Sequence, residues 1–206
     1  MHQPSTFIIC LSVEINAPVT LQLLSSLGTH GWSSQIYPAR NGWELSAAAW
    51  QDRGVRLVPS SKLAQQPGAQ GCLWSHMDLW ELCLARNEAI AVLESDALCL
   101  QPWPTSFVMR YDLAKIAYKF DRLRPNKRTG LWSPGAVGYV INPRGAAALL
   151  DHVRSTSALE ADKLIGTEIL SWTHAERLFD INTSSYSRSS TRSPSLDDYE
   201  RKIWRK

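Results

Sequence analysis

Short runs of consecutive apolar residues alternate along the chain with longer segments whose apolar residues recur at helical spacing. The short runs have the length and composition of buried strands. Strands are predicted at residues 7–11, 35–38, 89–93, 113–118 and 137–141, and a further short apolar stretch covers residues 97–100. Helices are predicted at residues 18–27, 70–86 and 143–153, the first with Gly28 as its stop and the last with Pro143 near its start.

The order of these elements predicts the fold class. The first forty residues form a β–α–β pattern, which is the unit that builds parallel sheets. We therefore predict an α/β domain with a mostly parallel central sheet flanked by helices. The polar segment 51–70 and the basic segment 119–134 are predicted as loops, and the second is long enough to be functional. Residues 184–195 are rich in Ser, Thr and Arg, so we divide the chain into a domain (1–183) and a basic C-terminal segment (184–206).

The length of 206 residues suits one domain, and the net charge of +3 is too small to indicate nucleic acid by itself. The distribution of the charge is more informative, because six basic residues fall within fourteen positions: Lys115, Lys119, Arg122, Arg124, Lys127 and Arg128. More basic residues follow in the last twenty. Such clusters attract the phosphates of nucleotides, membranes or nucleic acids, although a solvated basic face has the same composition.

The four cysteines lie in apolar surroundings without CxxC spacing. We interpret them as buried free thiols of a reducing compartment, rather than as disulfide or zinc ligands. No run approaches eighteen apolar residues, and no secretory signal precedes the first predicted strand. The expected location is therefore the cytoplasm, without a transmembrane segment.

Two acidic residues directly follow a predicted buried strand. The apolar run 89–93 leads into Glu94-Ser95-Asp96. In open α/β sheets ligands bind beyond the carboxyl ends of the strands, so Glu94 and Asp96 are expected at such an edge. Their oxygen atoms suit Mg²⁺ or Mn²⁺, which a nucleotide-sugar diphosphate requires. The same residues are also common as caps of strands and turns.

Several short motifs, taken together and in order, resemble glycosyltransferase family 25. They comprise the first strand (7–12), a turn (37–45), the start of a helix (70–80), the end of a strand (91–97), a later strand and helix start (138–146), and the segment 161–164. The resemblance implies a GT-A-like domain that moves a hexose, galactose or glucose, from a UDP-sugar to an acceptor hydroxyl with inversion.

The resemblance also implies roles for individual residues. Asp96 and Glu94 would hold Mn²⁺ or Mg²⁺, which takes up charge on the departing diphosphate. Asp162 would be the general base, with Glu168 as the reserve candidate, and His174 is a further candidate metal ligand. The residues expected to contact the donor are Ser12, Asn41, Gly42, Ser75, His76, Glu94 and Ser95. The residues expected to contact the acceptor or phosphates are Lys119, Arg122, Arg124, Lys127 and Arg128.

The chain departs from the family pattern in two places. Ser95 replaces the middle Asp of the usual Glu-Asp-Asp triplet, and residues 13–17 lack the arginines that tend to follow the first strand. Three functions therefore stay open. The acceptor is a cell-surface or lipid-linked glycan, with peripheral membrane contact through the basic C-terminus, or it is hydroxymethylated DNA contacted by the 115–128 segment. The third alternative is a non-catalytic module that binds a sugar or nucleotide.

Overall fold

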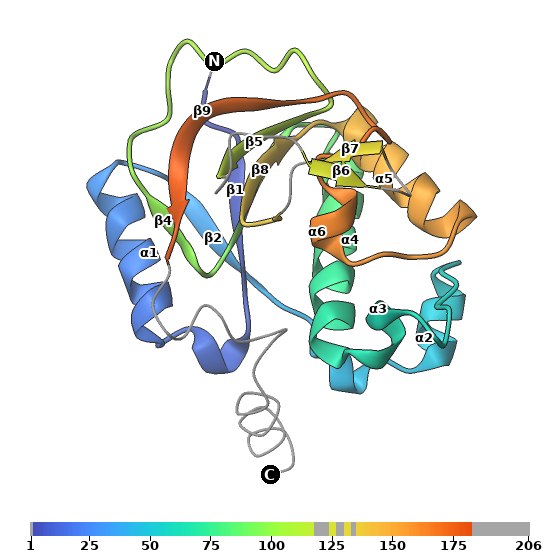
Figure 1. Cartoon of the computed structure of the whole chain (residues 1–206). Coiled ribbons are helices and arrows are strands. Elements are labelled where there is room, and N and C mark those ends of the chain that lie inside the picture. Colours follow the sequence, from blue (N-terminus) through green and yellow to red (C-terminus); the bar gives the residue numbers. More distant parts are fainter. Residues whose placement is uncertain (1, 118–123, 127–129, 133–134, 183–206) are drawn as a thin grey trace.

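The computed structural model describes residues 2–117, 124–126, 130–132 and 135–182, and it shows a mixed α/β fold (Figure 1). The central sheet has seven strands in the order β2-β1-β3-β8-β5-β9-β4. Their bounds are β1 Ser5–Cys10, β2 Ser34–Pro38, β3 Ile90–Glu94, β4 Ala97–Cys99, β5 Leu113–Ala117, β8 Gly138–Ile141 and β9 Trp172–Ile181. The predicted segment 184–206 lies outside the described residues.

The sheet is mixed, which corrects the prediction of a mostly parallel one. The pairs β1–β2, β1–β3 and β5–β9 are parallel. The pairs β3–β8, β5–β8 and β4–β9 are antiparallel. The β–α–β reading of the first forty residues is confirmed, but it predicted only the parallel half of the sheet. An apolar run indicates that a strand is buried on both faces, but it does not indicate the direction of the neighbouring strand.

The helices cover both faces of the sheet (Figure 1). Helix α1, Pro18–Thr29, lies on one face, and α4, Pro67–Arg86, lies on the other with α5, Pro143–Ser155, and the short α6, Ala161–Leu164. Alternate residues of each strand point to opposite faces. Ile8 and Leu93 belong to the core under α1, whereas Ile9 and Val92 belong to the core under α4 and α5.

The predicted loop 51–70 contains helical structure. Helix α2, Ala47–Asp52, and α3, Lys62–Gln65, precede α4, which begins at Pro67 rather than at residue 70. The serines before α2 and α3 cap them, because Ser46 accepts a hydrogen bond from Ala49 N and Ser61 from Ala64 N. Ser61 contributed to the loop-like composition of the segment, although its role is to start a helix.

Strand β9 was not predicted. Among its ten residues only Leu178 and Phe179 are buried, so no apolar run marks it. Its hydrogen-bonding partners are β5 on one side and β4 on the other, and both lie far away in sequence. The predicted loop 119–134 also contains two short paired strands, β6 (Arg124–Asn126) and β7 (Gly130–Trp132).

Candidate carboxylate site at the edge of the sheet

The site is built where β1 and β3 end side by side. The two strands are parallel with Ile9 opposite Glu94, so the residues that follow them emerge at the same edge. Strand β1 is followed by the 3-10 turn Ser12–Glu14, in which Ser12 is exposed. Strand β3 ends at Glu94, and a tight turn through Ser95 and Asp96 leads into β4. The sheet therefore places the predicted residues Ser12, Glu94, Ser95 and Asp96 at one edge.

Asp96 has a carboxyl group whose charged form is disfavoured by its surroundings. Its backbone carbonyl accepts a hydrogen bond from Asn182 N (2.7 Å). Its carboxylate oxygen Oδ1 is buried and has no hydrogen-bond partner in the described part of the chain. Burial, and then the negative charge of Glu94, raises the pKa of Asp96 from 3.8 to about 8. A bound cation would offset both effects, because it stabilises the charged form of the two carboxyl groups.

Glu94 faces helix α4. Its Oε1 lies 3.5 Å from His76 Nε2, and it accepts a contact from the Cys72 thiol at 3.6 Å. Cys72 and His76 are four residues apart on α4, which places both on the same side of the helix. The packing of α4 therefore places a thiol and an imidazole on one side of the carboxylate edge, which is the end of β3 with Glu94 and Asp96.

A buried hydrogen-bonded chain holds His76. His76 Nδ1 lies 2.8 Å from the Tyr139 hydroxyl, which accepts a second hydrogen bond from Trp80 Nε1 at 2.9 Å. All three side chains are buried. The indole N–H only donates, so the Tyr139 proton remains for His76 Nδ1, and this arrangement places the imidazole proton on Nε2, toward Glu94. Tyr139 and Trp80 were not predicted as site residues, because each is apolar in the sequence pattern.

Lys115 corrects the interpretation of the basic cluster. It is fully buried on β5, opposite Tyr139, and its Nζ donates a hydrogen bond to Gly135 O at 2.6 Å. Burial lowers its pKa from 10.5 to about 7, and the charges of Asp162 and Glu94 partly offset this. Lys115 is thus a buried cation beside the carboxylates rather than part of an exposed basic face. Charge spacing in the sequence could not separate it from its neighbours.

The candidate base Asp162 lies at the same site. It is the second residue of α6, and although the residue is exposed, protein atoms packed round its carboxyl group displace water. This desolvation, followed by the charges of Glu160 and Glu94, raises its pKa. The reserve candidate Glu168 is exposed in the connection from α6 to β9. His174 lies on β9 opposite Lys115, with its ring edge-on to Trp172 at 5.4 Å.

Asn41, Gly42 and Ser75 join a turn to the start of α4. A Cβ on Gly42 would lie 1.6 Å from the Pro67 carbonyl oxygen, and one on Gly71 would lie 2.3 Å from that of Arg40. The buried Ser75 hydroxyl accepts from Arg40 N (2.8 Å) and donates to Gly71 O (2.7 Å). Asn41 caps the 3-10 turn by accepting from Trp43 N. These contacts give the motif a structural function, and contact with a donor stays a prediction.

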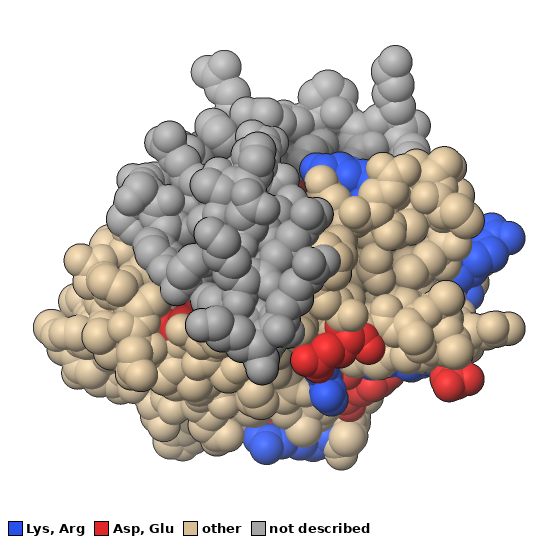
Figure 2. All heavy atoms as spheres, turned by 90° about the horizontal axis from the view of Figure 1, so that it is seen from below, with Lys and Arg blue, Asp and Glu red and all other residues tan. Residues whose placement is uncertain are grey.

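The predicted phosphate-contacting residues are barely covered by the structure. Lys119, Arg122, Lys127 and Arg128 lie outside the described residues, and Arg124 is described only as a backbone position of β6. On the face shown in Figure 2, described acidic and basic side chains lie beside one another, and most of the described surface around them is uncharged.

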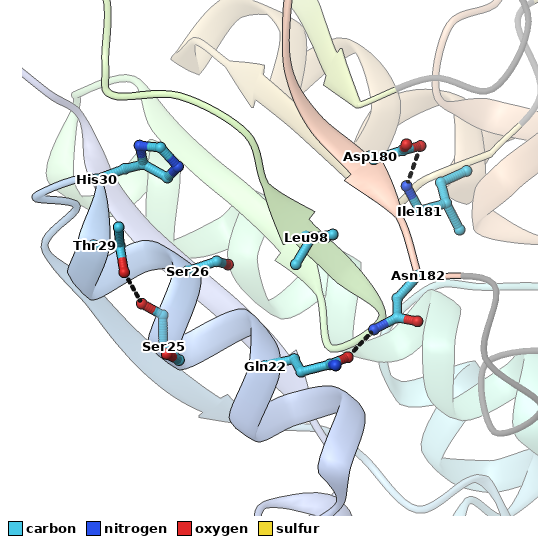
Figure 3. A pocket seen from close by; sticks show the side chains of 9 residues that line it. All are labelled: Gln22, Ser25, Ser26, Thr29, His30, Leu98, Asp180, Ile181 and Asn182. Carbon is cyan, nitrogen blue, oxygen red and sulfur yellow. Dashed lines mark hydrogen bonds between the residues drawn. The ribbon is translucent and has the colours of Figure 1, made fainter.

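A separate hollow of about 600 Å³ lies between α1, β4 and the end of β9 (Figure 3). Gln22, Leu98, Asp180 and Asn182 contribute to its lining, and Asn182 Nδ2 donates to Gln22 Oε1 at 2.6 Å. The predicted site residues do not line it. The hollow is therefore lined by other residues than the predicted site, although Asn182, which lines it, also donates its backbone N–H to Asp96 O.

The fold and this edge define an α/β protein with paired carboxylates suited to a hard divalent cation. A family model described as "Glycosyltransferase family 25 (LPS biosynthesis protein)" matches residues 60–129. This range contains Cys72, His76, Glu94, Asp96 and Lys115. Asp162 lies beyond it.

Three curated relatives were also found. A "Glycosyltransferase 25 family member" of Anopheles gambiae is 22% identical over 178 residues, or 75% of this chain and 30% of the relative. One of Aedes aegypti is 27% identical over 159 residues, or 66% of this chain and 26% of the relative. "Inactive glycosyltransferase 25 family member 3" of Homo sapiens is 33% identical over 81 residues, or 36% of this chain and 14% of the relative.

These matches confirm the resemblance that the motifs predicted, and the chain is similar to glycosyltransferase family 25 over the matched ranges. It spans less than a third of the length of each of these relatives. In the described part of the chain, no helix combines the length and the apolar character needed to cross a membrane.

Proposed function

We propose that the chain is a metal-dependent, inverting glycosyltransferase with a GT-A-like fold, which moves a hexose from a UDP-sugar to an acceptor hydroxyl. The observation that carries the proposal is the buried Oδ1 of Asp96, which has no partner among the described residues and lies near a second carboxylate, Glu94. A protein rarely keeps such a group unless a ligand or ion completes it. The family relationship supports transfer of a sugar.

The side chains at the edge fit a hard divalent cation. Glu94 and Asp96 supply oxygen ligands, and their mutual repulsion falls when a cation lies between them. A bound Mn²⁺ or Mg²⁺ would offset the charge that develops on the departing UDP. In this proposal Glu94 and Asp96 hold the ion, while Ser12 and Ser95 lie at the same edge for contact with the donor.

Asp162 is the proposed base. Its raised pKa makes its carboxylate a better proton acceptor than an ordinary Asp, and it lies close enough to Glu94 for their charges to interact. It would take the proton of the acceptor hydroxyl as that oxygen attacks the anomeric carbon. Inversion requires one such base and no covalent intermediate. A glycan is the proposed acceptor, because the matching family description names lipopolysaccharide biosynthesis.

A non-catalytic binding module is the second candidate. Ser95 removes one acidic residue from the motif, and one relative, matched over 36% of this chain, is named inactive. The two candidates differ in turnover. We expect the full chain to release UDP from at least one UDP-sugar in the presence of Mn²⁺, and to stop after metal is removed with EDTA. Binding of UDP-sugars without release of UDP under any metal would contradict the enzyme and favour the module.

A further inference from the structure

A second set of donor atoms overlaps the carboxylate edge and has a different chemistry. Cys72, His76 and Glu94 each offer one ligand atom, and these three atoms lie within 4.8 Å of one another. A thiol and an imidazole are ligands that Mn²⁺ and Mg²⁺ seldom take, whereas zinc is commonly bound by these groups together with a carboxylate. This set therefore suits a softer ion than the pair Glu94 and Asp96.

The spacing of these atoms matches tetrahedral zinc. With zinc–ligand bonds of about 2.3 Å to sulfur and about 2.1 Å to nitrogen or oxygen, the ligand atoms are about 3.4 Å (N to O) and about 3.6 Å (S to O) apart. In the structure His76 Nε2 lies 3.5 Å from Glu94 Oε1, and Cys72 Sγ lies 3.6 Å from it. Two of the three distances between these ligand atoms thus match tetrahedral zinc.

His76 points a buried nitrogen into this set. The ring is fully buried, and Nε2 has no hydrogen-bond partner among the described residues. Metal-binding histidines hold their other ring nitrogen with a hydrogen bond, and the Tyr139 hydroxyl lies 2.8 Å from Nδ1. Binding of an ion at Nε2 requires the tautomer with the proton on Nδ1, so the Tyr139 hydroxyl would rotate its own proton away from His76 and accept the Nδ1–H hydrogen bond. The orientation of His76 is therefore fixed before any ion arrives.

The proton of Cys72 must leave when zinc binds. Burial, followed by the charges of Glu94 and Asp162, raises the pKa of this thiol well above its usual value. The same carboxylates attract a divalent cation, and the cation in turn stabilises the thiolate. The spacing between cysteines does not reveal such a site, because one cysteine and one histidine from the same helix supply the ligands.

We propose that Cys72, His76 and Glu94 form a zinc site that shares Glu94 with the Mn²⁺ or Mg²⁺ site of the transferase. Nitrogen and sulfur ligands bind zinc more tightly than manganese, so zinc takes Glu94 away from the pair with Asp96. Zinc is consequently an inhibitor of the enzyme. The inhibition rests on the proposed transferase function, whereas zinc binding does not.

The binding is tested on the full chain with Zn²⁺ and with Co²⁺ as a coloured substitute. We expect one zinc per chain by equilibrium dialysis, and a cobalt spectrum with a thiolate-to-metal charge-transfer band. Cys72→Ser should remove that band and weaken zinc binding by at least about 10-fold, as the loss of even a supporting residue does. Cys99→Ser is the control, because Cys99 is a buried thiol on β4 that bonds to Gln101 O.

Two results would overturn the zinc site. One is a cobalt spectrum of the unmodified chain without a thiolate band, which needs no variant to fold. The other is equal zinc affinity in folded Cys72→Ser and Cys99→Ser proteins.

The inhibition is measured as release of UDP in Mn²⁺ with added Zn²⁺. We expect loss of activity that a zinc chelator reverses. With each protein's activity expressed relative to its own zinc-free rate, Cys72→Ser should require at least about 10-fold more zinc for inhibition than the unmodified chain. A chain that binds zinc but never releases UDP would refute the transferase and leave the zinc site standing. A chain that is active in Mn²⁺ but binds no zinc would refute only the zinc site.

Discussion

Helix α4 carries charged contacts on two sides, and they differ in how the charge is balanced. On its outer side Asp78 accepts hydrogen bonds from Tyr37, Arg40 and Arg53, at 3.1, 2.9 and 2.8 Å. On its inner side, toward the sheet edge, Glu94 meets a thiol and an imidazole, and Asp96 Oδ1 has no partner in the described part of the chain.

The difference teaches which carboxylates are available for a ligand. The carboxylate of Asp78 is fully hydrogen-bonded by side chains of the protein. It therefore stabilises the packing of α4 against the turn that contains Arg40 and against the end of α2. Asp96 Oδ1 is buried without a hydrogen-bond partner among the described residues, so ionising this carboxyl group costs stability unless an ion or substrate offsets the charge. The distinction depends on partners, and it is invisible in the identities of the residues.

The largest effect on activity is expected when Asp96 and Asp78 are each replaced by Asn in separate variants. Asp96→Asn should lower transfer by about 100-fold or more, because several kcal/mol of charge stabilisation by the metal is lost and each 1.36 kcal/mol is about tenfold. Asp78→Asn, assayed where it is folded, should retain activity. The readout is the rate of UDP release with saturating Mn²⁺. Full activity in Asp96→Asn would refute the metal assignment.

The next effect is a dependence of stability on pH in the metal-free protein. The pKa of Asp96 is about 8 in the folded state and 3.8 ordinarily, so between these values the folded state binds more protons than the unfolded state. The free energy of unfolding should therefore fall as pH rises from about 4 to about 8. Urea titrations at several pH values measure this. Asp96→Asn should flatten the slope, and an unchanged slope would contradict the assignment of the buried charge to Asp96.

A smaller effect is expected on the outer side of α4. Asp78→Asn should reduce the free energy of unfolding by about 2 kcal/mol, because two arginines lose their charged acceptor at a mostly buried position. The measurement is urea denaturation followed by tryptophan fluorescence, with the exposed Asp151→Asn as the control. A change equal to that of the control would show that the outer side is not a source of stability.

The smallest effect is expected at the rim of the same cluster. Arg154 contacts Glu81 at 2.6 Å, but both side chains are about two-fifths exposed. Solvent screens such a pair, so Arg154→Ala should change the free energy of unfolding by at most about 1 kcal/mol. The same denaturation experiment measures it. A loss larger than that of Asp78→Asn would reverse the ranking of buried and exposed pairs.

Most of the elements could be predicted from the sequence, whereas part of the site could not. Apolar runs and helical spacing located β1, β3 and α4, and the acidic residues after β3 marked the edge. Strand β9 escaped because its few buried residues make no run. The sequence predicts Lys115 as part of a basic surface, because the identity of a residue does not show whether its side chain is buried. In the structure Lys115 is fully buried.

The sequence by itself determined the α/β class, the position of Glu94 and Asp96 at the end of a buried strand, and the resemblance to a glycosyltransferase family. These features depend on local patterns, which are determined by residues close together in the chain. The tertiary structure alone decided which strands run antiparallel, that Lys115 is buried, and that Cys72 and His76 lie against Glu94. Such features depend on contacts between segments far apart in the chain, and there burial and the absence of partners set the charge of each group.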